Sequence, residues 1–200
     1  MSATIQTPSI RRERPSDLDT VGAAVTSIGV KAEEFGVGIL RQTKLTLTNV
    51  PVVTGNTSGA SFGSAKIYDF PEGRIAILGV TAKFTGITFN TEAGATGDIA
   101  GGGSGDYSLG STATADATLS LTDVDMLPSS AMLDPFVAGV GRSNAGSALA
   151  AAAQFDGTTT AIDMYLNAII DDADVSDGAA ADSVYFTGTI YVTWANLGDY

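Results

Sequence analysis

Aspartates are the residues of this chain whose type and spacing could support chemistry. The densest group precedes Gly178 and comprises Asp171, Asp172, Asp174 and Asp177. Ca²⁺ binds several hard oxygen ligands in a flexible loop, and carboxylates at alternating positions can supply them. The EF-hand pattern is not met, because no Glu stands at the closing position and the glycine is misplaced. A solvated turn, in which the carboxylates accept hydrogen bonds from backbone N–H groups, is therefore favoured over a Ca²⁺ site.

Asp123 and Asp125, together with Asp163, form a second acidic group that is compatible with glycoside hydrolysis. In a strand, alternation would place Asp123 and Asp125 on one face about 7 Å apart. Inverting enzymes separate their two carboxyl groups by about 6.5–9.5 Å. This spacing is common by chance, and the neighbouring sequence lacks tryptophans that could stack on sugars. We therefore predict that the chain is not an enzyme.

The composition removes most other chemistries. The sequence contains neither Cys nor His, which excludes a disulfide framework, Cys- or His-ligated zinc, the usual nucleophilic triads and a His general base. The glycine run at 101–103 has neither the spacing of a phosphate-binding loop nor a following lysine or helix. We expect no cofactor.

The charge is acidic and unevenly distributed. The formal net charge is −12, and residues 45–200 hold four basic residues against seventeen acidic ones. Nucleic-acid affinity depends largely on Lys and Arg releasing phosphate counterions, so we expect no nucleic-acid partner. Only 16% of the residues are charged. Small neutral polar residues cost little to desolvate, which suits extended contacts between proteins.

The first twenty residues are typical of an arm, since Pro8 and Pro15 prevent regular pairing. No apolar segment of a secretory signal follows the basic residues, and the longest nearly apolar run, 148–153, is far below the ~20 residues of a membrane span. We expect no membrane partner. A disordered leader is favoured over an arm that orders against a neighbouring subunit. In the second case the interface residues of the arm are Arg11, Arg12 and Arg14.

The clearest strand is the segment 183–194. Its apolar residues alternate with Tyr and Thr without a slip, and they are Val184, Phe186, Ile190, Val192 and Trp194. We expect this strand to be a central brace of the fold. Tyr185 and Tyr191 share the polar face, and a tyrosine offers a large contact area with a polar tip. That face is either a protein interface, with Tyr185 and Tyr191 as contact residues, or an inner sheet face packed on a loop.

Four further segments alternate, at 44–48, 65–70, 117–121 and 160–170. In the last, we expect the outward face to comprise Asp163, Tyr165, Asn167 and Ile169. The segment 74–89 changes phase near Gly79 and Gly86, which predicts bulges or a change of strand. The turn residues Pro71 and Gly73 predict a hairpin at 70–74.

Six to eight strands, separated by Gly, Pro, Asn and Asp clusters and almost without helical pattern, predict an all-β protein. We expect an antiparallel β-sandwich, as a jelly roll, with an extended N-terminal arm. The division we expect is an arm and connecting segment at 1–36 and the sandwich domain at 37–200.

The acidic, Cys-free sandwich rich in Gly, Ala and Thr, behind a proline-broken arm, resembles the decoration (cement) proteins of tailed-bacteriophage heads. The ending Gly188–Asp199, with Asp163–Asn167 and Asp171–Asp174, is similar to small virion proteins encoded near phage capsid genes. The resemblance implies a virion protein, made in the host bacterial cytoplasm, that trimerises and clamps the major capsid protein from the outer surface of the head.

The alternative is a carbohydrate- or receptor-binding β-module of a phage tail or surface appendage. Such a module needs exposed aromatic residues on loops. The one tryptophan of the chain, Trp194, lies instead within a predicted strand.

Overall fold

The computed structural model describes residues 21–36, 38–55, 61–90, 105–132, 142–148, 154–170 and 182–198. Within these ranges the strands are β1 (Ala23–Ala24), β2 (Val30–Phe35), β3 (Leu40–Thr54), β4 (Ser61–Asp69), β5 (Gly73–Asn90), β6 (Gly105–Gly110), β7 (Leu127–Ala131), β8 (Arg142–Ala148), β9 (Gln154–Gly157), β10 (Asp163–Ile170) and β11 (Asp182–Asn196). The helical elements of the described residues are two 3₁₀ turns, Thr26–Ile28 and Leu121–Asp123. The all-β prediction is confirmed.

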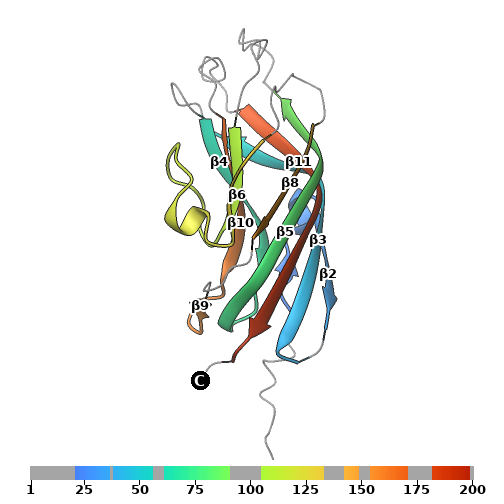
Figure 1. The fold of residues 1–200 in the computed structure, drawn as a ribbon, viewed down its shortest axis with the longest axis vertical. Coiled ribbons are helices and arrows are strands. Elements are labelled where there is room, and N and C mark those ends of the chain that lie inside the picture. Colours follow the sequence, from blue (N-terminus) through green and yellow to red (C-terminus); the bar gives the residue numbers. More distant parts are fainter. Residues whose placement is uncertain are drawn as a thin grey trace, which may run out of the picture.

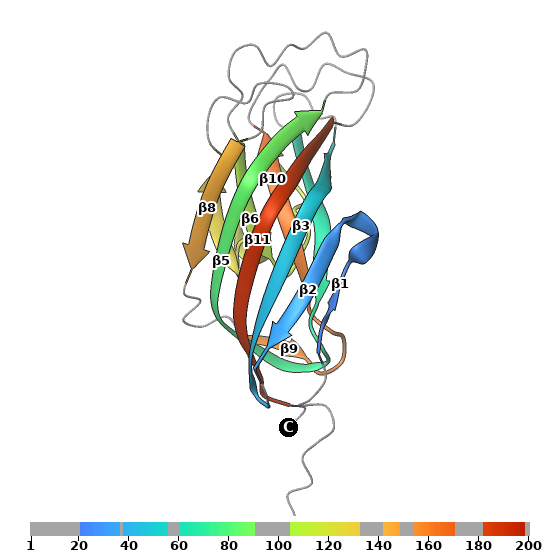
Figure 2. The same ribbon diagram turned by 90° about the vertical axis from the view of Figure 1, so that its right-hand side faces the viewer.

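All strand pairs are antiparallel, and one hydrogen-bonded path runs β7-β6-β10-β4-β3-β11-β5-β8. The path curls over itself into two layers (Figures 1 and 2). We call β2, β3, β11, β5 and β8 the front sheet, and β4, β10, β6 and β7 the back sheet. β3 and β4 join the two sheets through one residue pair, Thr54 with Gly63. The antiparallel two-layer arrangement agrees with the predicted sandwich class, whereas the jelly-roll assignment stays a prediction.

β11 is the central strand of the front sheet. It pairs with β3 from Asp182 to Ala195 and with β5 from Ser183 to Asn196. The five apolar residues predicted to share a face, Val184, Phe186, Ile190, Val192 and Trp194, are all completely buried. Both the alternation and the bracing role expected of this segment are confirmed.

The neighbours of β11 bulge while β11 stays regular. β5 carries one extra residue at Leu78 and another at Thr85, each next to a predicted phase change at Gly79 or Gly86. The inner face therefore returns to Ile77, Val80 and Phe84, which are buried. The prediction of bulges is confirmed, because an inserted residue moves the following side chains to the other face.

The segment before residue 37 contributes strands to the sheets. β2 pairs with β3 along its whole length, β1 pairs with the end of β4, and Val30 is completely buried. The expected boundary between residues 36 and 37 therefore falls between two strands that hydrogen-bond to each other.

The predicted hairpin at 70–74 is wrong. β4 pairs with β10, β1 and β3, whereas β5 pairs with β11, β8 and β9. Phe70 and Pro71 are buried, and Gly73 has φ of 122°. The turn residues were identified correctly, but burial of the aromatic and proline side chains sends the chain from the back sheet to the front sheet.

The predicted strand at 117–121 is also wrong. Residues 111–126 form a loop, which we call the knob loop and which is drawn in yellow outside β10 and β6 in Figure 1. The loop covers the outer face of the back sheet, so Asn167, predicted to face outward, is completely buried. The mistake has a physical reason, since alternation marks two faces but does not say whether a loop covers the second one.

Asn167 fastens the knob loop with every polar group of its amide. Its Nδ2 donates to the carbonyls of Thr112 (3.1 Å) and Asp123 (3.0 Å). Its Oδ1 accepts from the N–H of Thr114 (3.1 Å) and from the hydroxyl of Ser64 (2.5 Å). The loop is thus held to the sheet by a buried and fully paired side chain.

A second buried polar chain ties the front sheet to the back sheet. The indole Nε1 of Trp194 donates to the hydroxyl of Thr43 (2.8 Å), and that hydroxyl donates to the carboxylate of Glu34 (2.8 Å). The hydroxyl of Tyr68 donates to the same carboxylate (2.5 Å). Burial, followed by this hydrogen bond, raises the pKa of Tyr68, so the phenol stays protonated.

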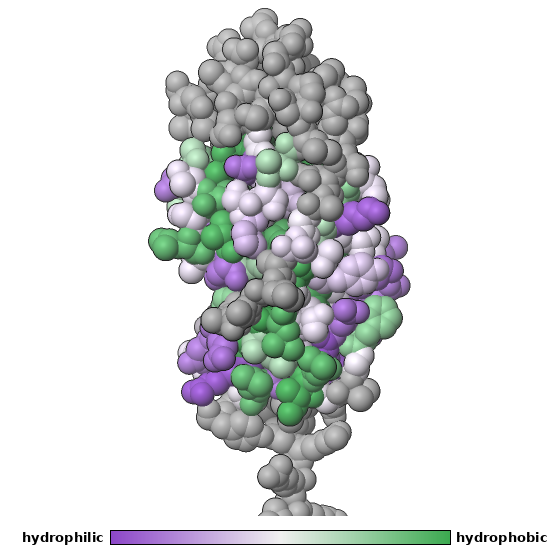
Figure 3. All heavy atoms as spheres, in the orientation of Figure 1, coloured by the Kyte–Doolittle hydropathy of each residue, from purple (hydrophilic) through white to green (hydrophobic). Residues whose placement is uncertain are grey.

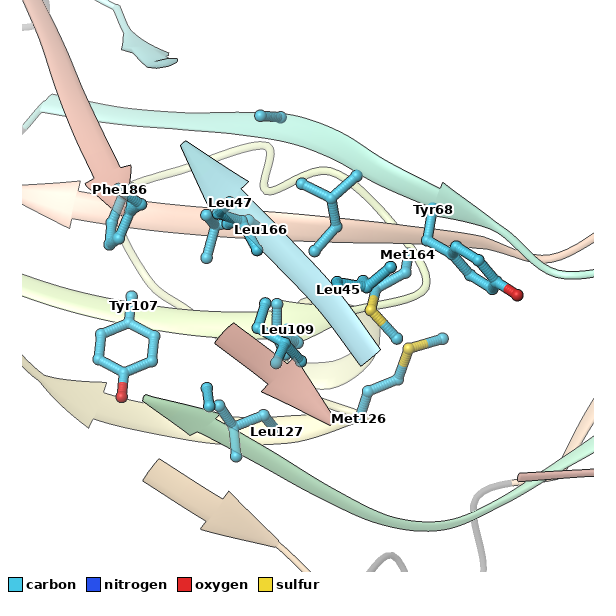
Figure 4. Packing of buried hydrophobic residues seen from close by; sticks show 14 of the residues in the cluster. Leu45, Leu47, Tyr68, Tyr107, Leu109, Met126, Leu127, Met164, Leu166 and Phe186 are labelled. Atoms are coloured by element: carbon cyan, nitrogen blue, oxygen red, sulfur yellow. The ribbon is translucent and has the colours of Figure 1, made fainter. Parts of the chain in front are cut away.

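The space between the sheets is filled by apolar side chains. Figure 4 shows Leu45, Leu47, Leu109 and Leu166 packed together, with Tyr107 and Phe186 beside them. Phe84 makes edge contacts with Tyr107 and with Phe186, both at centroid distances of 5.0 Å. Such aromatic pairs add to the stabilisation that burial alone provides.

The close approach of β11 to β5 generates a first prediction. A Cβ atom at Gly188 would lie 2.3 Å from the carbonyl oxygen of Lys83, whereas one at Gly86 would meet nothing nearer than 3.7 Å. Gly188→Ala should lower the free energy of unfolding by about 1–3 kcal/mol, and Gly86→Ala, its matched control, should lower it much less. Urea unfolding measures both, and equal losses would contradict the close approach.

Asn167 generates a second prediction. Asn167→Leu removes four hydrogen bonds that hold the knob loop to the sheet, so the free energy of unfolding should fall by on the order of 3 kcal/mol. Gln42 carries an exposed amide, and Gln42→Leu should change that free energy by less than about 0.5 kcal/mol. A small effect of Asn167→Leu in chemical denaturation would mean that the knob loop is not fastened as described.

Candidate interaction surface

The outer face of the front sheet is open and is covered by small polar side chains. It faces the viewer in Figure 2. Threonines lie on all three long strands, and they include Thr46, Thr48, Thr81, Thr85, Thr187, Thr189 and Thr193. Each of these side chains is half-buried or exposed. A sheet face that is apolar inside and Thr-rich outside matches the alternation of its strands, and it offers hydroxyl groups over a broad area.

The two tyrosines predicted as interface residues lie on this face. Tyr185 is half-buried, and Tyr191 is 40% exposed. Tyr191 stands opposite Lys44 on β3 and opposite Thr81 on β5. No loop of the described residues lies over this face in Figure 2. A contact with a partner stays a prediction.

A groove interrupts the face at the first bulge of β5. We call it the bulge groove, and its volume is about 440 Å³. Its lining includes Gln42, Leu78, Gly79, Thr81, Tyr191 and Thr193. Leu78 is 46% exposed because the bulge turns this apolar side chain outward. The sequence signalled the bulge through its phase change, but not the groove that the bulge produces.

The predicted arginine cluster and the dense acidic group lie outside the described residues. This applies to Arg11, Arg12 and Arg14 and to the segment 171–177. The arm and the solvated turn favoured for the acidic segment therefore stay predictions. Among the residues that the structure describes, no group of three His, Cys, Asp or Glu side chains is placed to hold a metal ion.

Asp123 and Asp125 do not share the face of a strand. Asp123 ends a 3₁₀ turn, and Asp125 follows it in the knob loop. Asp125 accepts hydrogen bonds from the N–H (2.8 Å) and the hydroxyl (2.6 Å) of Ser111. Burial raises the pKa of Asp125, and the bonds from Ser111 oppose that rise. This carboxylate has a structural role in closing the loop.

Asp163 belongs to a different cluster. It stands directly opposite Asp69 across β10 and β4, and Lys66 binds both carboxylates, at 3.0 Å and 2.5 Å. Burial raises the pKa of Asp69, and a hydrogen bond with Asp163 adds to that rise. For Asp163, hydrogen bonds with Asp69 and Lys66 outweigh burial and lower its pKa. The lysine neutralises a repulsion between like charges, so the three residues act as a cross-strand clamp.

No protein-family model matches the chain, and no curated protein sequence matches it. No helix among the described residues is long and apolar enough to cross a membrane.

The opposite pKa shifts of two aspartates generate a third prediction. Because burial raises the pKa of Asp125 above its ordinary value of 3.8, the folded protein binds more protons than the unfolded chain just above that pH. Stability contributed by Asp125 is thus present at low pH and is lost as the pH rises through the raised pKa. The difference in unfolding free energy between wild type and Asp125→Asn should fall across this interval.

Asp156 supplies the contrasting control. Hydrogen bonds from Thr158 lower its pKa, so its contribution is present above the ordinary pKa and is lost as the pH falls. The difference between wild type and Asp156→Asn should therefore rise with pH. Urea unfolding across the acidic range measures both slopes, and slopes of the same sign would contradict the two environments.

Proposed function

We propose that this chain is a structural virion protein that binds and stabilises the head shell of a bacteriophage. The observation that carries the proposal is the open, Thr- and Tyr-covered face of the front sheet, backed by a tightly packed core. In this proposal the partner is the major capsid protein, and the chain acts on the outer surface of the head as a homo-oligomer, by expectation a trimer.

The physical character of the face supports a protein partner. Hydroxyl side chains form hydrogen bonds with a partner and lose little solvation energy when they are covered, in contrast to charged groups. Tyr185 adds a half-buried aromatic side chain of a type enriched at protein interfaces. Strand pairing on both sides of β11 keeps this face rigid, so little conformational entropy is lost on binding.

Repetition supports a role in stabilisation. A shell that is loaded from within by packaged DNA gains strength from many bridging contacts, each of which can be weak.

The distribution of carboxylates points away from catalysis, because Asp125 closes a loop and Asp163 is neutralised by Lys66. A tail or receptor-binding module is the less favoured function, since Trp194 is completely buried in the core and unavailable for stacking on a sugar.

Head binding generates a fourth prediction. Purified protein should coat undecorated heads of the phage that encodes it, as seen by electron microscopy. Deleting residues 1–20, which include the three arginines, should weaken attachment and leave the melting temperature nearly unchanged. Each exposed ion pair contributes only about 0–1 kcal/mol, so the loss arises through repetition around the shell.

Two results would count against this account. Unfolding of the truncated protein would place residues 1–20 in the core, and attachment as tight as that of the full chain would make them a passive leader. A protein that binds no heads but binds members of a glycan array would instead favour the receptor-binding alternative.

A further inference from the structure

The knob loop exposes a leucine on a strained backbone. Leu121 is 86% exposed, the highest value among the large apolar residues that the structure describes as exposed. Its φ of 52° lies in the left-handed region, which is rare for a bulky side chain. Figure 3 shows an apolar projection where Figure 1 draws this loop, with hydrophilic atoms beside it. Strained backbone conformations cluster at functional sites, so strain at an exposed apolar side chain indicates a binding role.

This leucine is held in place from below. Asn167 and Ser108 bind the loop at the carbonyl of Asp123, and the hydroxyl of Thr112 donates to that of Thr122 at 2.7 Å. Asp125 closes the loop through Ser111. A rigid loop that presents an apolar tip has already lost the conformational entropy that binding would otherwise cost.

The front sheet differs sharply in charge from the rest of the described chain. Among the front-sheet residues whose side chains the structure describes, five are basic and two are acidic: Lys31, Arg41, Lys44, Arg74 and Lys83 against Glu33 and Glu34. The rest of the described chain holds one basic residue, Lys66, and eight acidic ones: Asp69, Glu72, Asp106, Asp116, Asp123, Asp125, Asp156 and Asp163. The strongly acidic protein therefore has one sheet with a basic excess.

The bulge groove and the knob loop are complementary. The groove is lined by the exposed apolar side chain of Leu78 and by the ring of Tyr191, and Lys44, directly opposite Tyr191, is paired with Glu33 at 2.6 Å. Lys83 follows Thr81 along β5, is exposed, and forms no ion pair with any described residue. On the other surface, Leu121 stands between Asp116 and Asp123 in the sequence of the knob loop.

We propose that Leu121 of one copy inserts into the bulge groove of a second copy of this chain. The apolar tip meets Leu78 and Tyr191, and the acidic residues of the knob loop meet Lys83 of the front sheet. The contact is head-to-tail, so a pair of copies leaves one knob and one groove free for further neighbours, and the assembly is a closed ring or an open chain. This contact deepens the proposed self-association and does not depend on binding to a shell.

Sedimentation velocity on the full chain tests the contact. The wild type should form assemblies larger than dimers, and high salt should weaken them, because exposed charges are screened.

Leu121→Asn removes the apolar tip but tolerates the left-handed backbone. It should raise the dissociation constant at least about tenfold while the melting temperature stays equal or rises. Leu40→Asn is the matched control, because Leu40 is also exposed (55%), and it should associate as the wild type does.

Mixing two variants separates a head-to-tail contact from other interfaces. Leu78→Glu should also prevent self-association, since it places a carboxylate in the groove. A mixture of Leu78→Glu and Leu121→Asn retains one intact knob and one intact groove, so it should form dimers and nothing larger.

Three results would overturn the proposal: a monomeric wild type at micromolar and millimolar concentrations, unchanged association of either variant, or no dimer in the mixture. A monomeric wild type that still coats heads would overturn this contact alone and leave the proposed function standing.

Discussion

The whole structure depends on a single strand that is paired on both sides along its length. β11 contacts β3 and β5 through continuous antiparallel ladders, and one of its faces is completely buried. A regular strand in this position forces its neighbours to adapt. β5 adapts with two bulges, and β3 adapts with one extra residue at Thr48 and Asn49, where Asn49 has a φ of 54°. Gly188 allows a close approach of β11 to the backbone of Lys83 on β5.

The division of the chain between a packed interior and an open face follows from this constraint. Inner side chains of β11 reach the back sheet, where Trp194 connects through Thr43 and Glu34 to Tyr68. Outer side chains of the same strand remain uncovered and, with the first bulge of β5, form the bulge groove. The back sheet instead has part of its outer face, at Asn167 and Ser108, covered by the knob loop. The outer surface of the front sheet is therefore open and contains the bulge groove, whereas the outer surface of the back sheet carries the acidic knob loop with the exposed Leu121. Both proposals depend on this difference.

Much of the front sheet could be predicted from the sequence, because periodicity reports local burial. The alternation of residues 183–194 identified β11, and the phase changes at Gly79 and Gly86 identified the bulges. Contacts between residues distant in sequence could not be predicted in this way. Asn167 looked like an outward residue, Pro71 and Gly73 looked like a hairpin, and Asp123 and Asp125 looked like a strand pair. In each case the outcome was decided by a loop or sheet that packs from elsewhere in the chain.

Native-state hydrogen exchange tests the central role of β11 most directly. If β11 organises the fold, its amides and those of the paired parts of β3 and β5 should exchange only through global unfolding, with a protection free energy equal to that from urea unfolding. The amides of β7, of β9 and of the knob loop should exchange through smaller openings at lower free energy. Exchange of β11 amides through a partial opening, while β6 and β10 remain protected, would contradict the account.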